Sequence, residues 1–223
     1  MDNALTDERL TGFINSLYKG NTAFLDEVEK KALDTGVPII RKETQAFLRF
    51  IIALKDPKEI LEIGTATGFS CILMAQYSSK ETKITTIEKY EKRLPIAEEN
   101  IRASGFSDRI ELIKEDASIV LPSMQKSFDM IFIDAAKAQY PFYLKEAAHL
   151  LKKGGVIVAD NCLQEGDILE SKFAVERRNR TIHKRMREFL KDVTSSDEYT
   201  TAVLALGDGV TVAYRHQDLK NEI

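Results

Sequence analysis

The chain has 223 residues, of which 43% are hydrophobic and 30% charged, and this length and composition suit one α/β domain over residues 1–223. Its net charge of −3 excludes a generic polyanion-binding protein, so any nucleic-acid surface has to be local. Cys71 and Cys162 lie far apart, which argues against a zinc site or a disulfide scaffold and suggests a reducing compartment. We find no signal-peptide pattern and no apolar run of membrane-spanning length, and we therefore expect a soluble, cytoplasmic protein.

The first part of the chain, residues 1–56, is expected to be helical and to precede an α/β core at residues 57–223. Apolar residues recur there at the spacing of amphipathic helices. Three segments show this spacing: Asp7–Tyr18, Phe24–Leu33 and Thr44–Leu54. These helices are expected to pack on the sheet, and an alternative is that Val37–Lys42, with Ile40, forms part of a lid over a cofactor.

The organising stretch of the chain is Lys58–Ser70, which reads K-E-I-L-E-I-G-T-A-T-G-F-S. Its apolar run Ile60–Ile63 predicts a buried strand, and the spacing over Phe69–Tyr77 predicts a helix. Gly64 and Gly68 between them allow a sharp turn and a close approach of the backbone to a ligand. The spacing E-x-G-x-x-x-G is not that of a dinucleotide fingerprint, so an NAD-dependent oxidoreductase is disfavoured. Taken alone, the motif also fits an ordinary strand–turn–helix.

Strands and helices alternate through the rest of the chain, which predicts a mostly parallel, doubly wound sheet. The expected strands are Lys83–Glu88, Ile110–Ile113, Phe128–Asp134 and Val156–Ala159, with helices over Glu91–Ala103 and Phe142–Leu151 and a turn at Lys152–Gly155. Two last strands, Tyr199–Leu206 and Val210–Tyr214, are joined by Gly207-Asp208-Gly209, which is a hairpin signal. The sequence therefore predicts a seven-stranded α/β sheet that ends in an antiparallel hairpin.

Polar residues follow the expected strands, where open α/β sheets bind ligands. Asp134 ends one strand, and Asp160 and Asn161 end the next one. Two carboxylates and an amide oxygen make a hard site that suits Mg²⁺, Mn²⁺ or Ca²⁺ rather than zinc. The alternatives are that Asp160-Asn161 is only a turn pair and that Asp134 only caps a helix. Three such residues at two strand ends favour the metal site over these alternatives. Glu88 is placed to accept the hydroxyls of a ribose, or is an exposed charge at a strand end.

These motifs resemble those of a known family. The pattern E-x-G-x-x-x-G at 62–68 is similar to motif I of the class I S-adenosylmethionine-dependent methyltransferases. The stretches I-D-A-A-K-A-Q-Y at 133–140 and A-D-N at 159–161 resemble the cation-dependent O-methyltransferases related to catechol and caffeoyl-CoA O-methyltransferase. The resemblance runs from about Val37 to the hairpin, and it implies S-adenosylmethionine and a divalent metal as cofactors.

The resemblance also implies roles for single residues. The metal ligands would be Asp134, Asp160 and Asn161, and Lys137 would be the catalytic base. The residues expected to line the cofactor are Ile40, Glu62, Gly64, Ser70, Glu88, Asp116, Ala117, Ser118 and Asp134. A homodimer is also implied, with the N-terminal helices as plausible contacts, whereas the aromatic gate that such enzymes often carry cannot be placed in this sequence.

Lys137 would by itself be interpreted as a surface lysine. Near a metal and a sulfonium, like charge disfavours its ammonium form, so that it could take a proton. The metal would chelate two adjacent oxygens of the substrate, and the resulting oxyanion would attack the methyl group. The substrate must therefore offer vicinal oxygens, at least one of them a hydroxyl.

A local basic segment lies within Lys172–Lys191, and Arg suits contacts with phosphate. The residues expected to bind RNA are Arg177, Arg178, Arg180, Lys184 and Arg185, with His183 among them. Only Glu176 and Glu188 oppose these cations, which favours polyanion contact over a solvated helix face.

The combination of motifs resembles the bacterial tRNA 5-hydroxyuridine methyltransferases. The resemblance covers V-P-I-I at 37–40, I-L-E-I-G-T-A at 60–66, F-I-D-A-A-K at 132–137, the Arg cluster and G-D-G-V at 207–210. The implied partner is a tRNA anticodon loop, whose wobble 5-hydroxyuridine would become 5-methoxyuridine. Its C5 hydroxyl and C4 carbonyl are vicinal oxygens, and a loop presents an unstacked base. The alternatives are an O-methyltransferase for small catechol or caffeoyl phenols and, below it, a non-catalytic cofactor-binding or RNA-binding module.

Overall fold

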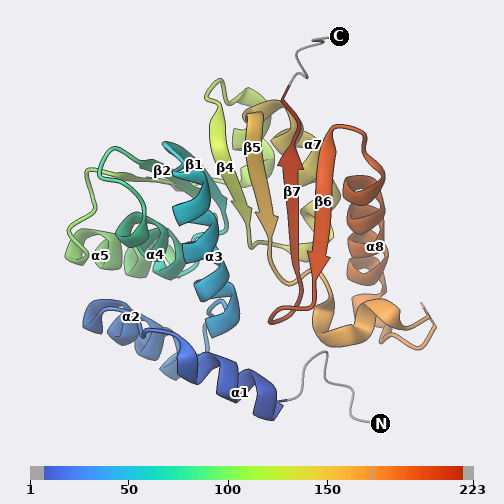
Figure 1. The fold of residues 1–223 in the computed structure, drawn as a ribbon, viewed down its shortest axis with the longest axis horizontal. Coiled ribbons are helices and arrows are strands. Elements are labelled where there is room, and N and C mark those ends of the chain that lie inside the picture. Colours follow the sequence, from blue (N-terminus) through green and yellow to red (C-terminus); the bar gives the residue numbers. More distant parts are fainter. Residues whose placement is uncertain (1–7, 172, 218–223) are drawn as a thin grey trace.

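A computed structural model of the chain describes residues 8–171 and 173–217. Its centre is a seven-stranded sheet in the order β3-β2-β1-β4-β5-β7-β6, with helices on both faces (Figure 1). The first five strands are parallel, and β7 runs antiparallel to β5 and β6. The predicted doubly wound sheet with a C-terminal antiparallel hairpin is thereby confirmed.

After three helices, strands and helices alternate from β1 to α8, and the hairpin β6–β7 ends the fold. The strands are β1 (Glu59–Ile63), β2 (Lys83–Ile87), β3 (Ile110–Ile113), β4 (Phe128–Ile133), β5 (Leu151–Ala159), β6 (Tyr199–Leu204) and β7 (Val210–Arg215). The α-helices are α1 (Glu8–Leu17), α2 (Ala23–Asp34), α3 (Lys42–Lys55), α4 (Phe69–Tyr77), α5 (Leu94–Ala103), α6 (Ala117–Val120), α7 (Tyr140–Leu150) and α8 (Arg180–Ser195). Within the described ranges, no helix is long and apolar enough to cross a bilayer.

Local sequence explains where the N-terminal helices begin and end. The Thr22 hydroxyl accepts a hydrogen bond from Leu25 N and caps α2. Helix α3 ends at Lys55, and its C-cap residue Asp56 takes a left-handed conformation (φ +42°) directly before Pro57. It begins at Lys42, two residues before the predicted start.

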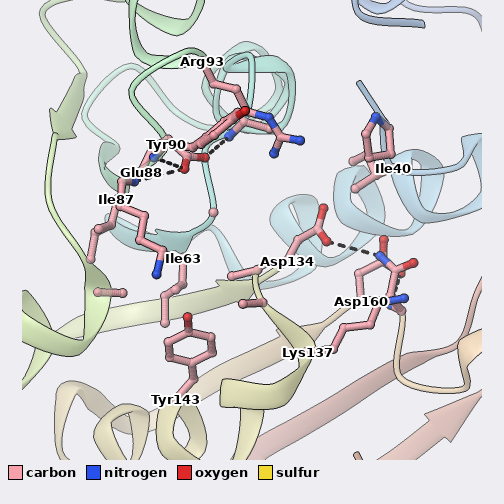
Figure 2. A pocket seen from close by; sticks show the side chains of 18 of the residues that line it. Ile40, Ile63, Ile87, Glu88, Tyr90, Arg93, Asp134, Lys137, Tyr143 and Asp160 are labelled. Atoms are coloured by element: carbon pink, nitrogen blue, oxygen red, sulfur yellow. Dashed lines mark hydrogen bonds between the residues drawn. The ribbon is translucent and has the colours of Figure 1, made fainter. Parts of the chain in front are cut away.

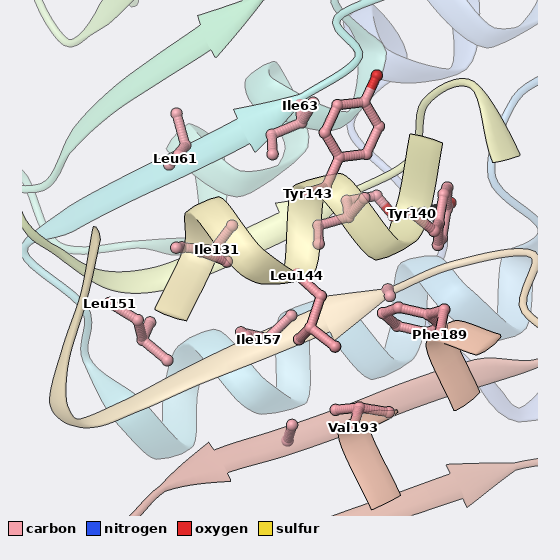
Figure 3. Packing of buried hydrophobic residues seen from close by; sticks show 14 of the residues in the cluster. Leu61, Ile63, Ile131, Tyr140, Tyr143, Leu144, Leu151, Ile157, Phe189 and Val193 are labelled. Carbon is pink, nitrogen blue, oxygen red and sulfur yellow. Dashed lines mark hydrogen bonds between the residues drawn. The ribbon is translucent and has the colours of Figure 1, made fainter. Parts of the chain in front are cut away.

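The sheet separates two apolar layers because side chains alternate along each strand. On β4, Ile131 and Ile133 face one layer, and Met130 and Phe132 face the other. The first layer packs under α7 and α8, where Figure 3 shows Tyr140, Tyr143, Leu144 and Phe189 against β1, β4 and β5. The second layer lies against α2, α3 and α4. Buried strands between two helical layers explain the nearly continuous apolar runs in the sequence.

Some boundaries differ from the sequence prediction. Lys152–Gly155 is not a turn but part of β5, where the pairing jumps from Phe128–Leu151 to Met130–Val156. The extra residues are accommodated as a bulge, which explains why they resemble a turn. Helix α5 begins at Leu94 rather than Glu91 because Pro95 occupies its first turn. Strand β6 ends at Leu204, two residues earlier than predicted.

The strand order reverses between β1 and β4, and this switch point decides where a ligand can bind. The chain continues from β1 toward β2 on one side and from β4 toward β5 on the other. The two connections therefore diverge at the carboxyl ends of β1 and β4, where Gly64 and Asp134 follow the strands.

Candidate active site

A cavity of about 760 Å³ lies at the carboxyl ends of β1, β2, β4 and β5. It reaches from the turn after β2 to the segment between β5 and α8, and Figure 2 shows the side chains that point into it. Most of the predicted site residues line it, namely Ile40, Gly64, Glu88, Asp116, Ala117, Asp134, Lys137, Asp160 and Asn161. Residues that lie up to 121 positions apart in the sequence, Ile40 and Asn161, are thus brought together at one edge of the sheet.

Gly64 is required because the chain passes close to the Asp134 backbone where the parallel strands β1 and β4 end. A Cβ atom on Gly64 would overlap with the backbone carbonyl oxygen of Asp134, and the Gly64 φ of +102° disfavours any L side chain. Asp134 N donates to Ile63 O at 3.0 Å, and Gly64 N donates to Ile87 O at 3.0 Å. The glycine therefore lets three strand ends converge on the cavity.

Glu88 holds the glycine-rich loop from the end of β2. Its carboxylate accepts hydrogen bonds from Ala66 N at 2.8 Å, Lys89 N at 3.0 Å and Tyr90 N at 2.8 Å. These three amides leave one acceptor site of the carboxylate for a ligand. The geometry suits a ribose contact, which stays a prediction.

Asp116 caps the short helix α6 beside the cavity. Its carboxylate accepts from Ser118 N and from the Lys89 ammonium, both at 2.8 Å. These hydrogen bonds, led by that of Lys89, lower the Asp116 pKa to about 2. Asp116 is therefore ionised at neutral pH and fixes the position of Ala117 on the cavity wall.

The acidic end of the cavity contains Asp134, Asp160 and Asn161. Asn161 Nδ2 donates to Asp134 Oδ1 at 3.2 Å, and Asn161 N donates to Asp160 Oδ1 at 2.8 Å. Burial, and then the charge of Asp134, raise the Asp160 pKa to about 7, and burial also raises the Asp134 pKa. The positive charge of Lys137 acts in the opposite direction on both carboxyl groups.

This donor set fits a hard divalent cation. Asp160 is buried and Asp134 is partly buried. Burial disfavours the negative charge of both carboxylates, and a bound cation would offset this cost. Within the described ranges, no group of three His, Cys, Asp or Glu side chains could hold a metal, so a third protein ligand would have to be the amide oxygen of Asn161. In that role Asn161 would present its Oδ1 to the cation. In the structure, the Nδ2 of the same amide donates to Asp134.

Backbone strain gathers around the same cavity. Three of its non-glycine residues have positive φ angles: Ala66 at +48°, Asn161 at +60° and Gln164 at +50°. Such conformations cost energy for L residues and persist where the surrounding structure enforces them, often at functional sites. The Asn161 conformation turns its side chain back toward Asp134.

Tyr140, a buried residue of α7, supports the acidic end of the cavity. Its hydroxyl donates to Asp160 O at 2.8 Å, and its ring meets the Phe189 ring edge-on, with centroids 5.3 Å apart. Both side chains are fully buried. Helix α8 thus stabilises Asp160 through one intervening side chain.

Comparison with known proteins identifies the family. A sequence profile described as O-methyltransferase matches residues 8–216. The chain belongs to the O-methyltransferase family. Catechol O-methyltransferase of Niastella koreensis is 34% identical over 143 residues, which are 61% of this chain and 65% of that enzyme, slightly under two thirds. Caffeoyl-CoA O-methyltransferase of Populus kitakamiensis is 32% identical over 179 residues, covering 76% of this chain and 74% of that one.

The solved structures agree with this assignment. The O-methyltransferase from Bacillus cereus in complex with SAH superimposes with a TM-score of 0.81 at 25% identity, covering 93% of this chain and 97% of that chain. Neither the family nor the fold fixes which acceptor this O-methyltransferase uses.

Glu62, Ser70 and Ser118 do not line the cavity of the O-methyltransferase. Glu62 is fully buried on the α3–α4 side of β1, beneath the glycine-rich loop, because side chains alternate along the strand. It accepts a hydrogen bond from Thr86 Oγ1 at 2.5 Å, and burial raises its pKa to about 7. A direct cofactor contact of these three residues stays a prediction, and the structure gives Glu62 a supporting position.

The basic segment lies beside the cavity, which Asn179 and Ile182 line. Several of its cations have protein partners. Arg178 pairs with Glu176 at 2.7 Å, Arg185 with Glu188 at 2.9 Å and Lys184 with Glu188 at 3.6 Å. Arg180 donates to Val175 O at 3.2 Å and Phe173 O at 3.4 Å, so it holds the preceding segment in place. His183 is buried and contacts Glu170 O at 3.1 Å, and so it does not belong to the exposed patch.

Sequence reasoning missed several residues of the cavity wall. Tyr143 projects from α7 toward Ile63 (Figure 2), and burial raises its pKa to about 12. It lies three residues after Tyr140, a spacing that places both rings on the same face of α7. Asp208 also lines the cavity, from the β6–β7 turn, and Arg41 lines it from Val37–Lys42, the candidate lid segment. The sequence separation between these two residues hides their proximity.

Proposed function

We propose that this O-methyltransferase transfers a methyl group from S-adenosylmethionine to one of two neighbouring oxygens of its acceptor, with the help of a divalent cation. The observation that carries the proposal is the arrangement of Asp134, Asp160, Asn161 and Lys137 in one cavity with the glycine-rich loop. A methyl donor and a chelated acceptor bound in this space would lie side by side.

The donor end would be formed by the loop after β1 and by the ends of β2 and β3. Glu88 would accept ribose hydroxyls, and Ala117 would pack against the base. Gly64 lines this end of the cavity, and its lack of a side chain lets the loop pass directly beside the Asp134 backbone. The complex of the Bacillus cereus relative with SAH supports this assignment.

The acceptor end would be formed by the carboxylates and Lys137. A cation held by Asp134, Asp160 and Asn161 would supply Lewis-acid polarisation of the acceptor hydroxyl. Lys137 Nζ would take the hydroxyl proton, and the oxygen would then attack the methyl carbon as the carbon–sulfur bond breaks. The rigid support of Asp160 by Tyr140 would keep the two reactants in line.

As the acceptor we propose wobble 5-hydroxyuridine in a tRNA anticodon loop, converted to 5-methoxyuridine. The support is the position of the basic segment: Asn179 and Ile182 line the cavity, and Arg177 and Arg178 directly precede them on the exposed side. Phosphates of a bound loop would meet these guanidinium groups while the base enters the cavity. The internal pairs of Arg178, Lys184 and Arg185 are exposed, so phosphate could replace the carboxylates at little cost.

A small catechol or caffeoyl ester is the second candidate acceptor. The names of the relatives from Niastella koreensis and Populus kitakamiensis favour it. Its vicinal oxygens would use the same carboxylates and the same base. The two candidates therefore differ only in whether the basic segment takes part.

The deciding experiment measures methyl transfer from labelled S-adenosylmethionine to tRNA from cells that lack this gene, with Mg²⁺ or with EDTA, followed by nucleoside analysis. We expect metal-dependent loss of 5-hydroxyuridine and gain of 5-methoxyuridine. The double variant Arg177→Gln with Arg178→Gln should lower kcat/KM for tRNA roughly tenfold and weaken its salt dependence. Catechol transfer by the same variant should not change.

The matched control is Lys30→Gln with Lys31→Gln, which removes two adjacent exposed cations from α2. It should leave tRNA methylation unchanged. Efficient transfer to a catechol together with no transfer to RNA would reject the tRNA proposal and establish the second candidate.

We also propose that the protein is a homodimer that uses its N-terminal helices. Large apolar side chains are exposed on α1, α2 and α3, namely Leu10, Phe13, Leu17, Leu33, Phe50 and Leu54. Each is at least half exposed, and large apolar side chains that gather on the surface commonly mark an interface. A second copy of the chain would cover it.

A further inference from the structure

An ion pair joins two distant parts of the chain at the cavity wall. Arg41 Nη2 lies 2.6 Å from Asp208 Oδ1. Arg41 is the N-cap residue of α3, and Asp208 lies in the turn between β6 and β7. Both residues line the cavity, so the ion pair bridges its N-terminal and C-terminal sides.

The β6–β7 turn is firmly attached to the segment that follows the acidic end of the cavity. Leu163 N donates to Asp208 O at 3.0 Å, and Cys162 N donates to Gly209 O at 2.8 Å. A Cβ on Gly209 would lie 2.7 Å from Leu163 N, and the Gly209 φ is +92°. Only glycine permits this close approach, so the turn offers Asp208 from a fixed position.

The N-terminal wall of the cavity, which we define as Pro38–Arg41, depends on contacts at its end. It has no regular secondary structure of its own. Gln45 Nε2 donates to Ile40 O at 2.9 Å and to Glu29 Oε1 at 2.9 Å, which ties the wall to α2. The contact of Arg41 with Asp208 ties the same wall to the hairpin.

The ion pair also lies close to the catalytic carboxylates. The Gly207 backbone packs against the first turn of α3, because a Cβ there would be 3.1 Å from Thr44 Oγ1. Thr44 Oγ1 in turn lies 3.5 Å from Asp160 Oδ1. A movement of the wall would therefore disturb both the cavity and the surroundings of Asp160.

We propose that Arg41 and Asp208 are a positioning pair that holds the N-terminal wall closed over the bound methyl donor. The side chain of Asp208 is 19% exposed and that of Arg41 is 52% exposed, so the ion pair is partly shielded from water on its acidic side. Without the pair, Ile40 would have to be ordered by the donor itself, and binding would become weaker. The inference rests on the proposed use of S-adenosylmethionine, for which S-adenosylhomocysteine serves as the probe.

The test is calorimetric binding of S-adenosylhomocysteine to wild type, Arg41→Gln, Asp208→Asn, the double variant and the charge reversal Arg41→Glu with Asp208→Arg. No metal or acceptor is needed. Each single variant should raise Kd roughly two- to tenfold, and the double variant should be no weaker than the worse single variant. The charge reversal should recover part of the affinity. Hydrogen exchange of the amides at 38–44 should become faster in the single variants and recover in the charge reversal.

The control is Lys30→Gln with Asp34→Asn, which removes an ion pair of the same 2.6 Å length from the exposed face of α2. Its Kd should equal that of wild type. Additive effects of the two single variants, or an unchanged Kd in Asp208→Asn, which keeps the side-chain shape, would overturn the inference. Failure of the wild type to bind S-adenosylhomocysteine would instead reject the proposed function.

Discussion

The Tyr140 hydroxyl reaches the backbone carbonyl of Asp160 at 2.8 Å and also lies 3.3 Å from the carbonyl of Ile133. A buried phenol therefore links the ends of β4 and β5, the two strands that carry the acidic end of the cavity. The hydroxyl is the donor in both contacts, and burial raises the Tyr140 pKa well above its usual value, so it stays protonated.

The Tyr140→Phe substitution should lower the free energy of unfolding by about 1–2 kcal/mol, because a buried carbonyl loses its donor. We expect a larger relative effect on kcat than on the affinity for S-adenosylhomocysteine, since Asp160 lies at the acceptor end. Chemical denaturation and steady-state kinetics measure both quantities. Tyr18→Phe, at an exposed tyrosine, is the control, and equal effects of both substitutions would contradict the prediction.

Gly64→Ala should be severely destabilising, by roughly 3 kcal/mol or more, because the new Cβ overlaps with the Asp134 carbonyl oxygen at a positive φ. Thermal unfolding and expression of soluble protein test this. Gly105→Ala is a control that also has a positive φ, at +78°, but no atom lies within 4 Å of the added Cβ. Its cost should be about 1 kcal/mol, from the backbone conformation alone. Similar losses for both variants would show that the steric contact is unimportant.

The buried Glu62 carboxyl should make stability depend on pH. Its pKa is about 7 in the folded protein and 4.5 as an unperturbed group, so the folded state keeps a proton that the unfolded state loses. Stability should therefore fall as the pH rises from about 4.5 to about 7, by up to on the order of 3 kcal/mol. Glu62→Gln should flatten this part of the curve.

Urea denaturation at several pH values, without divalent cations, measures the effect. Asp160 titrates in the same window, so the double variant with Asp160→Asn should be flatter still. Glu27→Gln, at an exposed helix position, should leave the wild-type slope unchanged. A Glu62→Gln curve parallel to that of wild type would mean that Glu62 is ionised in the folded protein.

Lys137→Ala should lower kcat by roughly 10²–10⁴-fold while the affinity for S-adenosylhomocysteine stays within a fewfold of wild type, because a general base acts on the acceptor. Single-turnover transfer and calorimetry separate the two effects. Lys145→Ala, at an exposed lysine on α7, is the control. A parallel loss of donor affinity would assign Lys137 a binding role instead.

Removing apolar area from α1 should dissociate the proposed dimer. Phe13 and Leu17 are 61% and 66% exposed and lie four residues apart on the same helix face. We expect Phe13→Asn with Leu17→Asn to elute as a monomer in size-exclusion chromatography with light scattering. Ile119→Asn, at a similarly exposed residue of α6, should keep the wild-type mass. A monomeric wild type would reject the dimer.

The local sequence was sufficient for most of the fold. Helix α4 and strand β3 have the predicted bounds, because glycines, prolines and apolar periodicity act within a few residues. The β5 bulge was not predictable in this way, since Lys152–Gly155 resembles a turn and only pairing with β4 draws it into the sheet.

For the candidate site too, local sequence predicted some features and only the tertiary structure decided others. Sequence alone determined which residues lie at strand ends, and so it placed Asp134, Asp160 and Asn161 together, because parallel strands share one carboxyl edge. Only the tertiary structure decided that Glu62 faces away from the cavity, that Arg180 holds a neighbouring segment, and that Arg41 meets Asp208. These features depend on the direction of side chains and on contacts between elements that are far apart in the chain. The local spacing of residues in the sequence predicts neither of them.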